Sequence, residues 1–403
     1  MILGAQRDLE IACVSTFPPR ACGIGTFTRD LVQGLRALPQ PTGVVIAAIN
    51  GDGEHYDYAP LVRVQMEEGN PASYVAAARR LNAMRRVEVV SLQHEFGKYG
   101  VWREDVTYED YVAPMLAAFE KPVVVTLHTV MPSPRAGARE AVRAIGEHAA
   151  AIVVMANIAK VLLEEDYGLD EGALAKVHHI PHGVPACAGT RTPPTLETAK
   201  RAVGLAGHRI LSTFGLINAG KGIEYVIDAM PALVAAYPDL LYLVIGETHP
   251  EVRKQEGERY RNELRARCRR LGVEQSVRFV NRFLPQAELV RYLAATDVYV
   301  TPYLSRDQIT SGTLAYALGC GKAIVSTPYL YATEALAEGR GLLAEARNAE
   351  SIGGAIDQLL GNPGLRRYVE SQAAGYGQVM AWPVVATQYR ELFASVRRPQ
   401  PLR

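Results

Sequence analysis

The chain has 403 residues, which is enough for two domains of ordinary size. Apolar residues make up 48% and charged residues 21%, so each half can form a buried core, and the composition excludes a disordered protein. The 43 basic residues nearly balance the 42 acidic ones, and the net charge of +1 excludes a general attraction to nucleic acid.

Short apolar runs alternate with amphipathic helical segments in the first half of the chain. The predicted strands are 11–15, 44–49, 87–92, 123–127, 151–155 and 176–180. Consecutive Val and Ile residues are typical of parallel strands that are buried on both faces. Helices are predicted between them, at 27–38 and 73–85 for example. This alternation predicts right-handed crossovers and a doubly wound sheet.

The same pattern begins again in the second half, without a sequence repeat. The predicted strands are 209–214, 241–245, 277–280, 297–301 and 323–326, separated by helices at 224–235, 286–295 and 314–318. A polar, proline-bearing stretch at 186–199 is typical of a linker. Past Trp382, residues 384–396 are expected to form a last amphipathic helix.

We therefore predict an α/β protein with two Rossmann-like, doubly wound parallel-sheet domains facing a central cleft. The N-terminal domain is expected over 1–189 and the C-terminal domain over 190–380. The helix of 381–403 could cross back to the N-terminal domain. Ligands of such sheets bind at the carboxyl ends of the strands, so the loops that follow the strands are the places to seek chemistry.

The spacing of the cysteines and the absence of long apolar runs indicate the cellular compartment in which the protein is expected. No run reaches the roughly 18 apolar residues of a membrane span, and no cationic stretch is followed by a long apolar one. The cysteines have neither metal-ligand nor disulfide-framework spacing; they are Cys13, Cys22, Cys187, Cys268 and Cys320. We expect reduced thiols, no integral membrane segment and a cytoplasmic location.

Two glycines stand just before a predicted helix in the first loop, which covers residues 17–27. Gly23 and Gly25 would let backbone N–H groups approach a ligand closely, and a helix N-terminus favours an anion. The alternative is that the glycines only let the chain turn into the helix. Because Pro18 and Pro19 precede the two glycines, we interpret the loop as a ligand contact.

Histidines follow two strands that are expected at the centre of the first sheet. His94 comes after strand 87–92, and His128 directly follows strand 123–127. A neutral imidazole can hydrogen-bond sugar hydroxyls, and a charged one could bind phosphate. For His94, a structural role with a bond to a backbone carbonyl is an equal alternative. His128 is the better candidate, since it would face the proposed cleft.

A lysine between glycines follows the first strand of the second half. Strand 209–214 leads through Gly215 to Lys221, and a helix begins at Glu224. Free N–H groups at a helix start and an ammonium both favour a diphosphate. The spacing is not that of a P-loop. The alternative is a solvated surface lysine, but the glycines on both sides of Lys221 favour phosphate contact.

Polar residues follow two further strands of the second half. Glu247 comes after strand 241–245. A run of hydroxyl residues and glycine opens the helix at 314–318: Thr310, Ser311, Gly312 and Thr313. This run would form a second anion cradle, although an ordinary N-cap is the alternative. Since it shares a sheet with Lys221, we expect both to bind one diphosphate.

With these loops in place, the chain resembles the retaining nucleotide-sugar glycosyltransferases of family 4, which have the GT-B fold. The resemblance covers nearly the whole chain, beginning with the glycine-bearing N-terminal loop. It rests further on IPHGV at 180–184, FG at 214–215 with KG at 221–222, ATDVYVTP at 295–302 and GKAIV at 321–325.

The resemblance implies a donor bound mostly by the C-terminal domain and an acceptor facing the N-terminal one. It implies that Lys221 contacts the donor phosphates and that His128 lies near the transferring sugar. Gly23 and Gly25 would face the diphosphate and the acceptor.

The sequence departs from the family where two glutamates normally contact the donor sugar and the ribose. Gln308 and Tyr316 occupy these places. Gln308 can still bond sugar hydroxyls, whereas Tyr316 cannot accept the paired ribose hydrogen bonds as a carboxylate does. Leu216 replaces the usual arginine before the lysine, and His182 replaces the asparagine of a Pro-Asn-Gly segment.

The sequence therefore predicts a retaining hexosyltransferase that acts on a saccharide or lipid-linked hydroxyl without a metal. Family frequency favours GDP-mannose or UDP-glucose as the donor. The alternatives are a degenerate, non-catalytic nucleotide- or sugar-binding relative and a GT-B sugar phosphorylase or epimerase. No nucleic-acid partner is expected. Weak peripheral membrane contact could come from four arginines near the helix 73–85, although a solvated basic face explains them equally: Arg79, Arg80, Arg85 and Arg86.

Overall fold

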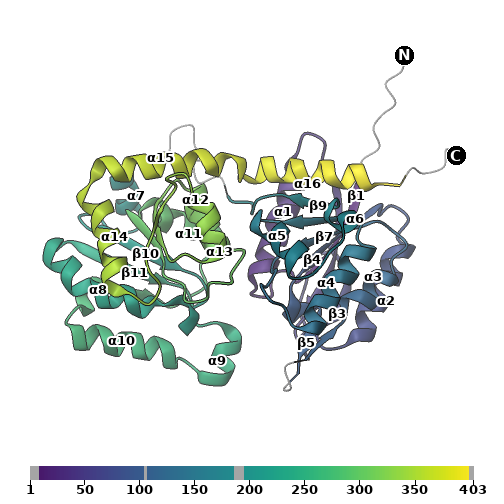
Figure 1. Ribbon diagram of the computed structural model, residues 1–403, viewed down its shortest axis with the longest axis horizontal. Coiled ribbons are helices and arrows are strands. Elements are labelled where there is room, and N and C mark those ends of the chain that lie inside the picture. Colours follow the sequence, from purple (N-terminus) through teal and green to yellow (C-terminus); the bar gives the residue numbers. More distant parts are fainter. Residues whose placement is uncertain (1–8, 104–106, 186–194, 399–403) are drawn as a thin grey trace, which may run out of the picture. The chain divides into compact units, whose positions relative to one another are not determined.

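The computed structural model describes residues 9–103, 107–185 and 195–398. The chain forms two compact units, which are coloured along the sequence in Figure 1. Unit 1 consists of Met1–Gly183 and Trp382–Arg403, and unit 2 of Val184–Ala381. The sequence had suggested boundaries at 189/190 and 380/381.

Unit 1 is built on a parallel sheet of seven strands with the order β3-β2-β1-β4-β7-β8-β9. Its strands are β1 (Glu10–Ser15), β2 (Gly43–Asn50), β3 (Val62–Glu67), β4 (Val89–His94), β7 (Val123–Leu127), β8 (Ala151–Val154) and β9 (Val177–His179). Its helices are α1 (Gly23–Ala37), α2 (Pro71–Ala83), α3 (Val112–Ala117), α4 (Ala136–His148), α5 (Ile158–Glu165), α6 (Glu171–Leu174), α16 (Trp382–Val396) and the 3-10 turn η1 (Phe96–Lys98). A short antiparallel hairpin, β5 (Gly100–Trp102) and β6 (Tyr108–Asp110), follows η1.

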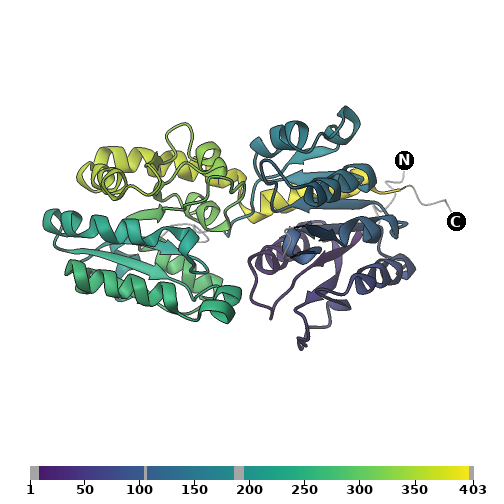
Figure 2. The same cartoon turned by 60° about the horizontal axis from the view of Figure 1, so that its bottom comes forward.

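Unit 2 repeats the architecture with six parallel strands in the order β12-β11-β10-β13-β14-β15. They are β10 (Arg209–Phe214), β11 (Leu240–Ile245), β12 (Val277–Val280), β13 (Val298–Thr301), β14 (Ala323–Ser326) and β15 (Leu342–Leu343). The helices are α7 (Leu196–Ala202), α8 (Ile223–Ala236), α9 (Pro250–Glu256), α10 (Arg259–Leu271), α11 (Gln286–Ala294), α12 (Gly312–Gly319), α13 (Leu330–Ala335), α14 (Ala349–Gly361) and α15 (Pro363–Val379), with the 3-10 turns η2 (Ala219–Lys221) and η3 (Glu274–Ser276). Helices cover both faces of each sheet (Figure 2).

The prediction of two doubly wound parallel sheets is confirmed, and every predicted strand is present. The sequence missed β3, β15 and the β5–β6 hairpin. β3 is an edge strand whose burial alternates along its length, so it lacks the continuous apolar run of the central strands. The predicted linker 186–199 is wrong where it overlaps α7.

The last helix belongs to unit 1, where α16 lies beside α1 (Figure 1). A Cβ at Gly34 of α1 would lie only 3.0 Å from the Cβ of Ala386, so the glycine allows this close approach. Tyr389 of α16 bonds the Thr126 hydroxyl of β7 at 3.1 Å. The C-terminal residues therefore complete the core of the first unit.

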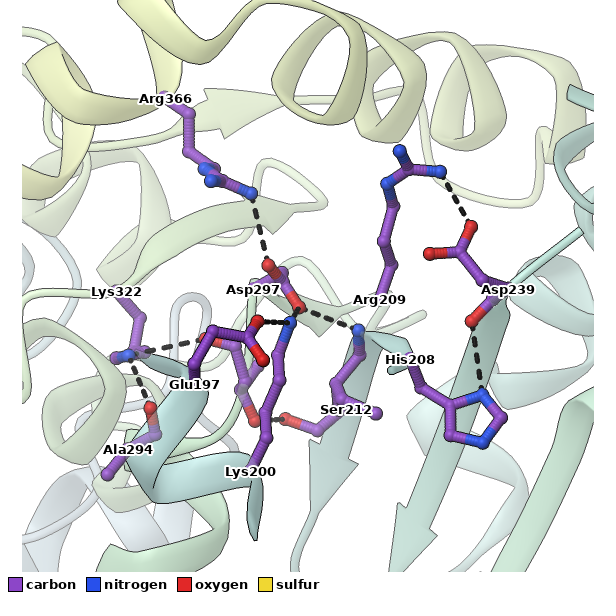
Figure 3. Close-up of polar contacts among 12 residues, drawn as sticks. Glu197, Lys200, His208, Arg209, Ser212, Asp239, Ala294, Asp297, Lys322 and Arg366 are labelled. Carbon is purple, nitrogen blue, oxygen red and sulfur yellow. Dashed lines mark hydrogen bonds and ion pairs between the residues drawn. The ribbon is translucent and has the colours of Figure 1, made fainter. Parts of the chain in front are cut away.

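A buried charge cluster joins the strand starts of unit 2 (Figure 3). Asp297 is 3% exposed and accepts hydrogen bonds from Lys200 Nζ and from the backbone N–H of Ile210, both at 2.8 Å. Its other oxygen accepts from Arg366 at 3.1 Å. One carboxylate thus ties α7, β10 and α15 to the start of β13.

The structure corrects two sequence-based expectations about single residues. Cys320 is disulfide-bonded, so the prediction of reduced thiols is wrong there; Cys13, Cys22 and Cys268 are free, and Cys187 lies outside the described residues. The helix predicted at 73–85 ends at Ala83 as α2, so two of the four arginines follow it. Within the three described ranges, no helix is both long and apolar enough to cross a membrane.

Candidate functional site

Each sheet has one point at which its connections reverse direction. The reversal lies between β1 and β4 in unit 1, and between β10 and β13 in unit 2. In open α/β sheets, ligands bind outside the carboxyl ends of the two strands at such a point. The loops after these four strands contain most of the candidate residues.

In unit 2, Gly215 directly follows β10 with a φ of 130°, a conformation that disfavours any side chain. A Cβ there would lie 3.2 Å from the Thr313 methyl group and 3.9 Å from Lys221 Nζ. Gly215 therefore leaves open the space between the lysine and the start of α12.

Lys221 is a half-buried cation that lies against an aromatic ring. Its Nζ lies 3.9 Å from the centre of the Tyr303 ring. Among the residues that the structure describes, no carboxylate lies within ion-pair distance of Lys221. The residue immediately precedes Gly222, the N-cap of α8, which makes no side-chain cap. An uncompensated ammonium beside a helix N-terminus is suited to bind an anion.

Hydroxyl groups gather at the start of α12. Ser311 caps the helix by accepting from the N–H of Leu314 at 3.3 Å. The Thr313 hydroxyl bonds Tyr303 at 2.7 Å and Ser311 at 3.2 Å. The hydroxyl of Thr310 is buried and has no hydrogen-bond partner among the described residues. Together with Gly312, these residues form a group of polar residues at the helix start, and Thr313 borders the space beside Lys221 that Gly215 leaves open.

The two residues that replace the family's glutamates have local partners. Gln308 donates to the carbonyl of Thr310 at 2.8 Å. Tyr316 is 7% exposed, packs 6.4 Å from Phe214 and accepts a hydrogen bond from Gln286 at 3.0 Å. Gln286 could not be predicted as part of this site, because it reaches Tyr316 from α11, which lies far away in the sequence.

We predict Glu247 as a donor-binding residue because it follows β11, and in the structure its partner is Arg253. Its carboxylate lies 3.5 Å from Arg253. The preceding Gly246, with a φ of 135°, packs against Gly215 so closely that a Cβ would lie 1.9 Å from the Gly215 carbonyl oxygen. The β11 loop thus supports the Gly215 turn through its backbone.

In unit 1, His128 is buried at the end of β7. Its Nε2 lies 2.9 Å from the side-chain oxygen of Gln93, which makes Nε2 the protonated nitrogen of a neutral ring. Burial, with smaller contributions from His182 and His94, lowers the pKa of His128 to about 3. The ring packs edge-on against Phe27 of α1 at 5.0 Å. At neutral pH, Nδ1 of His128 can accept a hydrogen bond, and the ring carries no positive charge.

His94 is completely buried. The hydrogen bond to a backbone carbonyl that a structural role would predict is not present among the described residues. Neither ring nitrogen has a hydrogen-bond partner among the described residues, and the ring stacks on Tyr99 at 5.5 Å. Burial lowers its pKa to about 3. His94 thus forms part of an aromatic core beneath the β4 loop.

The two N-terminal glycines differ in what they permit. Helix α1 begins at Gly23 with no side-chain cap, and a Cβ there would meet nothing within 4 Å. A Cβ at Gly25 would lie 3.3 Å from the Thr16 hydroxyl oxygen, at the end of β1. Gly25 therefore lets the helix approach β1, whereas Gly23 leaves its backbone N–H accessible.

Several charged residues at the switch point of unit 1 were not predicted. Glu68 accepts from Arg20 and, at 2.9 Å, from Lys98, which joins the loops after β1, β3 and β4. Glu95 accepts from the Thr129 hydroxyl at 2.7 Å, and burial raises the pKa of Glu95. The run QHEFGK at 93–98 could have indicated this cluster, because three of its residues are charged or carry an imidazole at the end of a central strand.

We expect acid to destabilise unit 1 because its buried histidines resist protonation. The pKa of His182 is lowered to about 4, and those of His94 and His128 to about 3, mainly by burial. The histidines of the unfolded chain bind protons near pH 6.5. Below that pH, proton binding therefore stabilises the unfolded state relative to the folded one. Each of the three histidines should lower the free energy of unfolding by about 2 kcal/mol between neutral pH and pH 5.

Urea unfolding at pH 7.5 and pH 5.0 measures this loss. The variant His94→Leu should lose less stability between the two pH values than the wild type, by about the contribution of one histidine. Replacing the exposed His208 with glutamine is the matched control and should leave the loss unchanged. Equal losses in wild type and His94→Leu would contradict the assignment.

No group of three or more His, Cys, Asp or Glu side chains suited to a metal ion occurs in the described parts of the chain.

Comparison with known proteins shows which proteins this chain is similar to. The model of the family "Glycosyl transferases group 1" matches residues 208–362, which include β10 to α14. A GDP-mannose-dependent monoacylated alpha-(1-6)-phosphatidylinositol monomannoside mannosyltransferase of Corynebacterium glutamicum is 22% identical over 98% of this chain and 100% of its own length. A D-inositol 3-phosphate glycosyltransferase of Jonesia denitrificans is 28% identical over 68% of this chain and 66% of its own.

Solved structures show the same fold. A glycosyltransferase from Rickettsia africae superposes with a TM-score of 0.72 at 15% identity, covering 97% of this chain and 99% of its own. Anabaena Alr3699/HepE in complex with UDP also gives 0.72, at 14% identity over 96% and 100%. Residues 208–362 are therefore similar to the group 1 glycosyltransferases, and the whole chain has the GT-B fold that its sequence resembles.

Proposed function

We propose that the protein transfers a hexosyl group from a nucleoside diphosphate sugar to a hydroxyl acceptor, with retention of configuration at the anomeric carbon. The observation that supports this most is the ammonium of Lys221, which has no carboxylate partner in the described chain and lies beside the hydroxyls at the start of α12. Such an arrangement suits a diphosphate better than any neutral group.

In the proposed reaction, the bond between the anomeric carbon and the diphosphate oxygen breaks, and its electron pair goes to the diphosphate. The sugar becomes oxocarbenium-like as the acceptor oxygen forms the new bond, and the acceptor proton passes to the departing phosphate oxygen. Charge therefore develops on the diphosphate, where Lys221 and the N–H groups near Gly312 would stabilise it. Stabilisation of this kind is typically the largest contribution to catalysis.

His128 would position the transferring sugar. Its Nε2–H is already directed to Gln93, and its low pKa keeps the ring neutral. A neutral ring can bond hydroxyl groups without repelling the positive charge that develops on the sugar. Gln308, whose side-chain amide is held at Thr310, would bond sugar hydroxyls.

The names of the relatives support particular classes of donor and acceptor. One relative is named as GDP-mannose-dependent, and HepE was solved with UDP and with UDP-glucose, which supports GDP-mannose or UDP-glucose as the donor. The relatives' names also support an inositol-bearing or lipid-linked hydroxyl among the saccharide acceptors. We propose a metal-independent reaction, in which Lys221 and the α12 start neutralise the diphosphate, and a cytoplasmic location.

A thermal-shift screen against GDP, UDP, ADP and their sugars tests the proposal. One nucleotide should raise Tm by about 5–10 °C at a hundredfold excess over its Kd, because it binds only the folded state. NMR of the product formed from the matching sugar nucleotide then reports the anomeric configuration. No shift with any nucleotide would contradict the proposal. Binding without turnover or donor hydrolysis would favour a non-catalytic relative, and consumption of free phosphate a phosphorylase.

A further inference from the structure

Tyr303 is a buried aromatic residue that contacts both parts of the candidate diphosphate site, Lys221 and the start of α12. It follows β13 and is 2% exposed. The Lys221 ammonium lies 3.9 Å from the centre of its ring. Its hydroxyl bonds the hydroxyl of Thr313 at 2.7 Å, in the first turn of α12. One side chain therefore connects the cation to the helix start.

Two further contacts hold Tyr303 in place, one at its ring and one at its backbone. Tyr329 stacks on it, with ring centres 5.3 Å apart and planes at 18°. The Tyr303 carbonyl accepts a hydrogen bond from the Thr327 hydroxyl at 2.6 Å. With ring, hydroxyl and carbonyl all engaged, Tyr303 has little freedom to move.

The backbones that bear Tyr303 and Lys221 are also in direct contact. The N–H of Leu304 donates to the carbonyl of Gly220 at 3.0 Å. Gly222, with a φ of 62°, approaches the Pro302 carbonyl so closely that a Cβ would lie 2.1 Å from its oxygen. The two loops on either side of the switch point therefore form one rigid support for the ammonium.

We propose that Tyr303 is a positioning residue whose ring holds Lys221 ready for the diphosphate of the donor. An aromatic face attracts an ammonium through its quadrupole but carries no net charge. A carboxylate in the same place would neutralise Lys221 and compete with the phosphates, whereas the ring orients the cation and leaves its charge available. This inference rests on the proposed function and adds to it the residue that orders the phosphate-binding cation.

Isothermal calorimetry with matched ligands separates positioning from general structure. The probes are whichever of GDP, UDP and ADP binds the wild type, and its nucleoside without phosphates. Tyr303→Leu should weaken diphosphate binding about tenfold, within the range of a partly desolvated cation–π contact. Nucleoside binding should change less than twofold. Tyr303→Phe, which keeps the ring, should stay near wild type in both measurements.

A double-mutant cycle then tests whether Tyr303 acts through Lys221. In a Lys221→Ala background, Tyr303→Leu should cause no further loss of diphosphate affinity, because the two residues share one interaction. Tyr331→Leu is the matched control, a tyrosine of α13 that is 3% exposed; it should weaken neither ligand selectively. If Tyr303→Leu does not fold, Tyr303→Met offers an unbranched, flexible side chain that can fill the space without a ring.

The outcomes distinguish the inference from the proposed function. Equal loss of diphosphate and nucleoside, wild-type affinity in Tyr303→Leu, or additive losses with Lys221→Ala would each overturn the positioning role. A wild-type protein that binds none of GDP, UDP and ADP would overturn the proposed function itself, and the inference with it.

Discussion

Replacing Lys221 with alanine should lower kcat about 100- to 1000-fold while the fold stays intact. The ammonium is the one charged group that we place at the departing diphosphate, and removing a single preorganised group of this kind typically costs that much. Its side chain makes no ion pair among the described residues, so its loss should not destabilise unit 2. The effect should appear mainly in kcat, because the negative charge on the diphosphate increases in the transition state.

Steady-state kinetics with the donor found in the screen measure this effect, and thermal unfolding checks the fold. The matched control is Lys254→Ala, a lysine of α9 whose side chain is 65% exposed and paired with Glu251. That variant should keep wild-type kcat and KM, since an exposed ion pair contributes little. A kcat for Lys221→Ala within threefold of the wild type would rule out the role of the ammonium.

The two sheets could be predicted from the sequence because their central strands are buried on both faces. β7, for example, is a continuous run of apolar or β-branched residues, and both β7 and β10 have the bounds that the pattern indicated. The edge elements could not be found in this way. In β3 the buried residues Val64 and Met66 alternate with charged and polar ones, because solvent covers part of an edge strand.

The candidate site could be predicted only as far as single loops reveal it. Lys221 and the run at 310–313 were recognisable because a glycine directly follows β10 and hydroxyl residues open the helix α12. The residues that join these loops were not, since Tyr303 and Gln286 contact the site across distances in sequence that no local pattern reports. Which carboxylate pairs with which cation likewise depends on packing, as Glu68 between Arg20 and Lys98 illustrates.

Replacing Asp297 with asparagine should destabilise the protein by about 3–5 kcal/mol. The buried carboxylate bonds Lys200, whose side chain is 5% exposed, and also Arg366 and the backbone N–H of Ile210 (Figure 3). Asparagine has nearly the same shape but no charge, so two cations would remain in or near the core without their counter-ion. Removing one partner of a buried pair carries a cost of this size, because the remaining charge stays desolvated.

Urea unfolding of Asp297→Asn and of a matched variant, Asp239→Asn, measures this cost. Asp239 pairs with Arg209 at 2.6 Å in the same unit, but the two side chains are 40% and 42% exposed (Figure 3). Water screens that pair, and its loss should cost less than about 1 kcal/mol. The contrast isolates burial as the cause, since both variants remove one carboxylate charge. Equal losses in the two variants would show that the Asp297 cluster is solvated in solution and does not tie β10 and β13 together.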